Sequence, residues 1–177
     1  MDAKTTVKKF IAPNYLPIII ITVIPITTII GLIVLLCLIP INKRAKNTIA
    51  ALEASGRLER AAAELNSATA KSYIKGNLVL TDNFIFCKHN GYIFTYGEVV
   101  WAYKHHFTQR YLLIPISVTD SLYLATTGIK PVCVAQMGKD KNDEIIEALR
   151  EIYRHNPRCR LGYNAENQAA YRALTGK

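Results

Sequence analysis

Basic side chains are the residues of this 177-residue chain best suited to binding chemistry. The formal net charge is +9, which favours negatively charged partners without identifying them. A series of basic residues between positions 71 and 110 lies near the ends of the strands predicted below. We take these residues as candidates for binding an anionic ligand such as a phosphorylated lipid head group: Lys71, Lys75, Lys88, Lys104, His106 and Arg110. The competing interpretation is a set of solvated side chains on the rim of a sheet.

Histidine and cysteine are spaced too irregularly to predict a metal centre. Cys87 and His89 would share one face of a strand, because side chains alternate along it. A zinc site would also need paired ligands at a spacing such as C-x₂-C or H-x₃-H, and the sequence has neither. Motifs of serine hydrolases, nucleotide-binding loops and zinc proteases are missing as well. The sequence therefore predicts no metal, no cofactor and no enzymatic activity.

The aromatic residues are patterned like those of a sheet core. Trp101 and Tyr103 alternate with Val99 along one predicted strand. Sheets that bind RNA instead expose a pair of aromatic rings on which bases stack. The pattern therefore argues against nucleic acid as a partner.

An uncharged apolar run from Tyr15 to Ile41 is the longest in the chain. A helix needs roughly 20 apolar residues to cross a hydrocarbon core of about 30 Å, so the run predicts one transmembrane helix in the cell membrane. Pro25 would kink this helix, and the lipid bilayer would be a partner of the chain. The Lys and Arg residues that follow, together with the unpaired Cys87, Cys133 and Cys159, predict that the C-terminal part is cytoplasmic.

Residues 42–71 are rich in helix-forming Ala, Glu, Arg and Lys, which predicts a helical connector. Gly56 is expected to break it into two shorter helices. Because Leu52, Leu58 and Leu65 are sparse, we interpret the connector as a solvated, semi-rigid stalk. A helix lying on the membrane surface is the alternative, since Lys and Arg follow the apolar run directly.

From Ser72 to Met137 the apolar period changes to two, which indicates an antiparallel meander of short strands. Asn90-Gly91 predicts a type I′ hairpin turn, in which both central residues have positive φ. No helix lies between the strands, so parallel βαβ units are excluded and a sandwich or barrel is favoured. Seven runs are predicted as strands: 78–80, 84–87, 92–96, 99–103, 111–114, 122–126 and 132–135.

One amphipathic helix follows the strands and ends before Asn156-Pro157. Asp140 is the candidate N-terminal cap. Ile145, Leu149 and Ile152 form an apolar stripe that should pack on the sheet. The polar residues Glu147, Arg150, Glu151 and Arg154 are expected to face water.

The order of seven short strands and a closing helix resembles the pleckstrin-homology-like (PH-like) barrel. The segments KGNLVLTDNFIF, GEVVWAYKH and HNPRCRLGY resemble those of uncharacterised bacterial single-span membrane proteins that carry such a domain. The resemblance implies no catalytic residues. The predicted class is α+β, with a tail at 1–14, a transmembrane helix at 15–41, a connector at 42–71, a PH-like barrel at 72–157 and a C-terminal appendage with a short final helix at 158–177.

The resulting functional expectation is a membrane-anchored binding or scaffolding module. Its partner would be an anionic lipid head group or another protein at the membrane, and the sequence does not specify the oligomeric state. An accessory or regulatory subunit of a membrane complex is the alternative, followed by a membrane-bound enzyme of unrecognised type.

Overall fold

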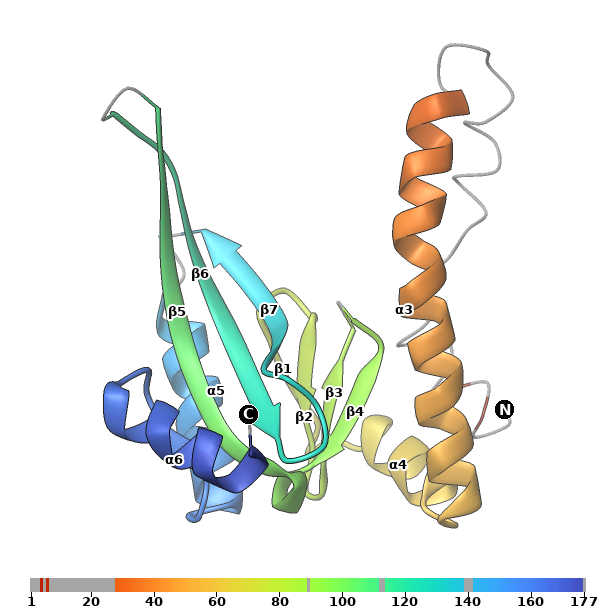
Figure 1. The fold of residues 1–177 in the computed structure, drawn as a ribbon. Coiled ribbons are helices and arrows are strands. Elements are labelled where there is room, and N and C mark those ends of the chain that lie inside the picture. Colours follow the sequence, from red (N-terminus) through yellow and green to blue (C-terminus); the bar gives the residue numbers. More distant parts are fainter. Residues whose placement is uncertain are drawn as a thin grey trace.

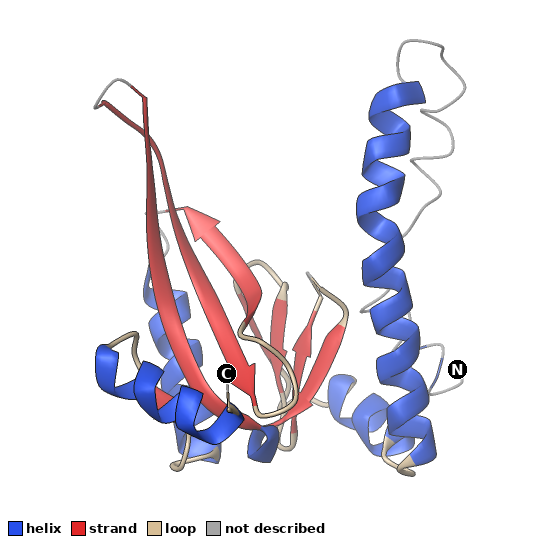
Figure 2. Ribbon diagram, viewed as in Figure 1, coloured by secondary structure: helices blue, strands red, loops and turns tan. Residues whose placement is uncertain are grey.

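The computed structural model describes residues 4, 6, 28–88, 90–111, 114–138 and 142–176. Its class is α+β, with two small sheets and helices packed around them (Figures 1 and 2). In chain order the elements are α3 (Thr28–Ala54), α4 (Leu58–Leu65), β1 (Lys71–Tyr73), β2 (Leu78–Leu80), β3 (Phe84–Cys87), β4 (Tyr92–Thr95), the 3-10 turn η1 (Tyr96–Glu98), β5 (Val99–Tyr111), β6 (Ile114–Thr126), β7 (Val132–Gly138), α5 (Asn142–His155), β8 (Arg160–Leu161) and α6 (Ala165–Thr175).

The predicted transmembrane helix is contradicted. Within the described part of the chain, no helix combines the length and the apolar composition that a membrane span requires. The helix α3 is described from Thr28 and continues past Ile41 into a polar stretch with Lys43 and Arg44. Residues 15–27, with the predicted kink at Pro25, lie outside the described residues. The prediction of a single-pass membrane protein, and the orientation that was inferred from this helix, are therefore not supported either.

The predicted closed barrel is also wrong. The strands form two separate four-stranded sheets, with the orders β1-β2-β3-β4 and β7-β6-β5-β8. We call them the first and the second sheet. The chain turns through η1 between β4 and β5, so these consecutive strands belong to different sheets. Among the described residues, no strand of one sheet pairs with a strand of the other, and β4 is left as an edge.

Six of the seven predicted strand runs coincide with observed strands or lie largely within them. Of the run 111–114, Tyr111 is the last residue of β5 and Ile114 the first of β6, and residues 112–113 lie outside the described residues. The two strands of this hairpin pair from Val99↔Thr126 to Tyr111↔Ile114. Beyond the pairs that β6 makes with β7, they form a projecting two-stranded arm (Figure 1).

The main core lies between the two sheets and includes α5. Ile145, Leu149 and Ile152 are all buried there, as the stripe predicts. Glu147 is exposed, as expected, whereas Glu151 is largely buried. The predicted cap Asp140 lies outside the described residues.

The predicted solvated stalk is wrong, because α3 and α4 cover the other face of the first sheet. Ala45, Ile49 and Leu52 of α3 and Leu58 and Ala61 of α4 are buried in a second hydrophobic cluster. Its sheet residues are Val79, Phe84, Phe86 and Ile93. Strands β2 and β3 are apolar on both faces, so each face needs a cover. Gly56, with φ +66°, separates the two helices as predicted.

The hairpin between β3 and β4 is present, but its turn is not type I′. Gly91 has φ +71°, but Cys87 pairs with Tyr92, so the loop is longer than the two-residue loop of a type I′ turn. A Cβ atom on Gly91 would lie 3.0 Å from the carbonyl oxygen of Ile41 and 3.2 Å from the Cβ of Ala45. This glycine therefore allows α3 to approach the turn closely.

Candidate functional site

Among the predicted anion-binding residues whose side chains the structure describes, no single shared site is formed. Lys71 lies on β1, Lys75 in the β1–β2 turn and Lys88 directly after β3. Lys104, His106 and Arg110 lie on β5, and the side chain of Arg110 is outside the described residues. Only Lys104 and His106 come together, and they do so on a carboxylate. The strand-end pattern in the sequence therefore does not correspond to a shared pocket.

Lys104 and His106 converge on Asp120, which lies on the neighbouring strand β6. The Asp120 carboxylate is almost fully buried, and its two oxygens contact Lys104 Nζ at 3.0 Å and His106 Nδ1 at 2.6 Å. Burial by itself would raise the pKa of Asp120. The hydrogen bonds and positive charges of His106 and Lys104 outweigh that effect and hold the pKa below its ordinary value.

A hydroxyl group extends this cluster, because Thr108 Oγ1 lies 3.2 Å from His106 Nε2. The order hydroxyl, imidazole, carboxylate is also the order in a catalytic triad. Here, however, Lys104 neutralises the carboxylate that would have to stabilise a protonated imidazole. His106 and Asp120 are also direct cross-strand partners. We interpret the cluster as a set of cross-strand polar contacts that stabilises the pairing of β5 with β6.

The thiols and imidazoles are dispersed over the fold. Across the described ranges, no three His, Cys, Asp or Glu side chains are grouped so that they could hold a metal ion. Cys87 is fully buried, and burial raises the pKa of its thiol. His89, its predicted neighbour on the strand face, lies outside the described residues.

A groove of about 470 Å³ runs along the β4 edge of the first sheet. One wall is β4, the second is the C-terminal half of α3 with Asn47, Thr48, Ala51 and Leu52, and the third is the β6–β7 loop at 126–129. All four consecutive residues of β4 line the groove. Side chains alternate between the faces of a strand, so this continuous lining means that the groove borders the strand edge.

The groove is apolar at its base and polar at its rim. Phe84, Ile93, Phe94 and Leu52 supply the base and are buried. Arg57 and Glu98 stand on the rim with opposite charges. The Glu98 carboxylate accepts a hydrogen bond from Thr95 N at 3.0 Å, which fixes the end of β4.

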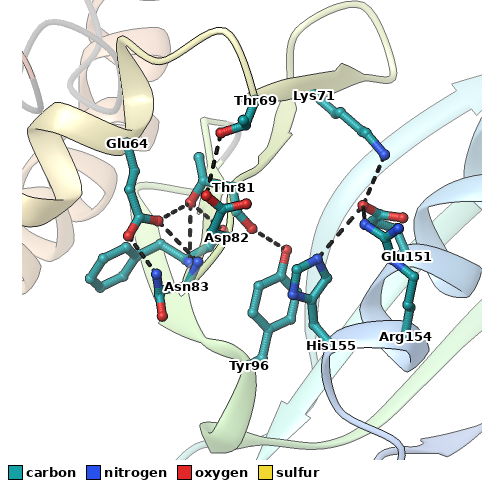
Figure 3. A network of polar contacts seen from close by, with 11 residues as sticks. Glu64, Thr69, Lys71, Thr81, Asp82, Asn83, Tyr96, Glu151, Arg154 and His155 are labelled. Carbon is teal, nitrogen blue, oxygen red and sulfur yellow. Dashed lines mark hydrogen bonds and ion pairs between the residues drawn. The ribbon is translucent and has the colours of Figure 1, made fainter.

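A second, polar pocket of about 250 Å³ lies where β1, the β2–β3 turn and the end of α5 meet. Figure 3 shows its charged side chains. Glu151 Oε1 lies 3.0 Å from Lys71 Nζ, 2.6 Å from an Arg154 guanidinium nitrogen and 3.7 Å from His155 Nε2. Thr69 and Asp82 form the opposite wall, and Thr69 Oγ1 donates to Asp82 at 3.5 Å.

Sequence reasoning named Lys71 but missed its neighbours in this pocket. Glu151 and Arg154 were assigned to the water-facing side of the helix. The spacing E-x₂-R-H does place Glu151, Arg154 and His155 on one side of a helix. The partner strand that brings in Lys71 is 80 residues away, and no local signal marks it.

Comparison of the chain with protein-family models, with curated proteins and with solved structures finds no match. The function must therefore be inferred from the two pockets and their surroundings.

Proposed function

We propose that this protein is a binding module that takes up a short, extended polypeptide segment in the groove between α3 and β4. The observation that carries this proposal is the continuous lining of the groove by edge strand β4, from Tyr92 to Thr95. The proposed activity is recognition of a protein partner, without catalysis.

The strand edge favours a polypeptide over a small apolar ligand. On its outer side, β4 has no strand partner among the described residues. In an antiparallel strand, alternate residues direct their N–H and C=O groups to the outer edge. An extended peptide can satisfy these groups at regular intervals while its side chains enter adjacent pockets.

The shape and composition of the groove support the same assignment. Its volume falls within the usual range of about 300 to 1,000 Å³ for ligand sites. The apolar base formed by Leu52, Ile93 and Phe94 suits one or two apolar side chains of the peptide. Arg57 and Glu98 on the rim can orient a segment that carries charges of both signs.

Substitution of the α3 wall tests the proposal. Random linear peptides displayed on phage are selected against the wild-type chain, and the tightest binder is titrated by fluorescence polarisation. Ala51→Trp should raise its dissociation constant at least about tenfold, because the ring would occupy the groove. Ala50→Trp is the matched control, since Ala50 is the adjacent exposed residue of α3 and does not line the groove.

Hydrogen exchange distinguishes strand addition from simple pocket binding. The amide of Ile93, which faces the outer edge of β4, should exchange more slowly when the peptide is bound, whereas Thr95 N already donates to Glu98. Equal affinity of the peptide for wild type and Ala51→Trp, or unchanged exchange along β4, would refute the proposed function.

A further inference from the structure

We propose that the polar pocket beside α5 binds the oxyanion group of a ligand, a phosphate or a carboxylate, and that Glu151 competes with this ligand from within the site. The pocket is distinct from the groove. It offers three cationic or potentially cationic donors, Lys71, Arg154 and His155, which already converge on a single carboxylate oxygen.

The donors outnumber the acceptor that they share. An ammonium group has three N–H donors and a guanidinium group has five, and one carboxylate oxygen cannot accept from all of them. Lys71 and Arg154 also retain 54% and 65% of their side-chain exposure, so a ligand arriving from solvent can reach both. Arg154 can hold such an oxyanion with two parallel hydrogen bonds.

The walls of the pocket are held in place before any ligand binds. The His155 ring stacks on Tyr96 at a centroid distance of 4.4 Å, and Tyr96 Oη donates to the carbonyl of Thr81 at 2.8 Å. On the other side, Glu64 of α4 accepts from Thr81 Oγ1 at 2.8 Å and from Asn83 N at 2.9 Å (Figure 3). Because these side chains are already held in position, less conformational entropy is lost when a ligand binds.

Stability alone is a poor explanation for this cluster. Ion pairs whose cations are more than half exposed contribute little, with a median of roughly 0 to 1 kcal/mol. Here the cations are more exposed than the carboxylate, which retains 14% of its side-chain exposure. The fold therefore gathers exposed cations around one acceptor at the wall of a cavity.

The charges also limit the class of ligand. Glu151 and, across the pocket, Asp82 repel additional negative charge. The site should therefore prefer one phosphate or carboxylate group to a polyphosphate.

Titration of the full chain with inorganic phosphate tests this assignment, with acetate and pyrophosphate in parallel. Binding is followed by NMR signals of the His155 ring and the Arg154 side chain. Glu151→Gln should tighten phosphate binding about tenfold, because it removes the competing charge but keeps the size of the side chain. Lys71→Ala and Arg154→Ala should weaken it at least about fivefold in the Glu151→Gln background. Acetate should bind at the same residues, and pyrophosphate should show no gain over phosphate.

Two controls make the test specific. Lys75→Ala removes an exposed lysine that does not line the pocket, and Glu147→Gln removes an exposed carboxylate of α5. Neither should change phosphate binding, and Lys71→Ala should not change peptide binding in the groove. The proposal is overturned if Glu151→Gln shows no saturable binding, or if Lys75→Ala weakens binding as much as Lys71→Ala does.

Discussion

Asp120 shows how a single residue determines what its neighbours can do. Lys104 and His106 looked like parts of an anion site in the sequence, but both contact one buried carboxylate on the adjacent strand. A buried charge is tolerated only when it is paired and hydrogen-bonded. The two cations therefore stabilise Asp120.

Asp120→Asn should lower the free energy of unfolding by about 1 to 3 kcal/mol at pH 7, because it removes charge-assisted hydrogen bonds in a buried position. The folded-state pKa of Asp120 is lower than its unfolded value of about 3.9. Its stabilisation is therefore present above the unfolded pKa and is lost as the pH falls through the folded pKa. Urea unfolding at neutral and acidic pH measures this effect.

The difference between Asp120→Asn and wild type should shrink at acidic pH, below the folded pKa. Asp82→Asn is the control, because Asp82 is exposed, and it should change stability by no more than about 0.5 kcal/mol. A difference between Asp120→Asn and wild type that stays constant with pH would show that the Asp120 charge is not the cause.

Among the elements, α5 serves two purposes. One face carries the buried stripe Ile145, Leu149 and Ile152 against residues of both sheets. Its last turn carries Glu151, Arg154 and His155 into the polar pocket. Packing of the stripe thus sets the position of the charged end, which links the core to the proposed oxyanion site.

Leu149→Ala should lower the free energy of unfolding by about 2 to 5 kcal/mol, because the lost transfer free energy and the cavity left behind add together. Glu147→Ala, on the exposed face of the same helix, should stay within about 0.5 kcal/mol of wild type. Urea unfolding monitored by circular dichroism compares the two. Similar midpoints for both variants would mean that α5 does not pack between the sheets.

The whole molecule is layered rather than barrel-shaped. In order, the layers are α3 with α4, the first sheet, the main core with α5, the second sheet, and α6 (Figure 1). On the outer face of the second sheet, Trp101 and Tyr103 pack with Tyr171 of α6. The sheets remain separate at β4, and α3 covers that side only in part. The groove exists because this edge is neither paired nor fully covered.

A chain that begins at Lys71 should be much less stable than one that begins at Asn42. Removing the helical cover exposes Val79, Phe84, Phe86 and Ile93, and burial of each large side chain stabilises by about 1.5 to 3 kcal/mol. The sum approaches the typical total stability of about 5 to 15 kcal/mol. We expect the shorter chain to bind the dye ANS and to unfold without a sharp transition.

The longer chain should unfold cooperatively and bind little dye. Sharp, coincident transitions of both chains would show that the first sheet does not depend on α3 and α4.

The local pattern of the sequence was sufficient to predict where most helices and strands lie. Strands β2 and β3, the break at Gly56 and the apolar stripe of α5 follow from side-chain periodicity and backbone preference, which act over a few residues. The run from 84 to 87 also indicates that both faces of this strand are covered. Continuous apolar residues in a short strand require burial on both faces, and the helices that cover the second face are those interpreted as a stalk.

Only the tertiary structure decided which elements meet. Whether β4 pairs with another strand, and whether Lys71 reaches Glu151 from 80 residues away, depends on contacts between segments remote in sequence. The transmembrane helix predicted from the apolar run before Ile41 was wrong for a related reason. Composition can show that a segment must avoid water, whereas the packing of the second half of α3 depends on its contacts with the first sheet. Periodicity specifies the faces of each element, and three-dimensional packing selects their partners.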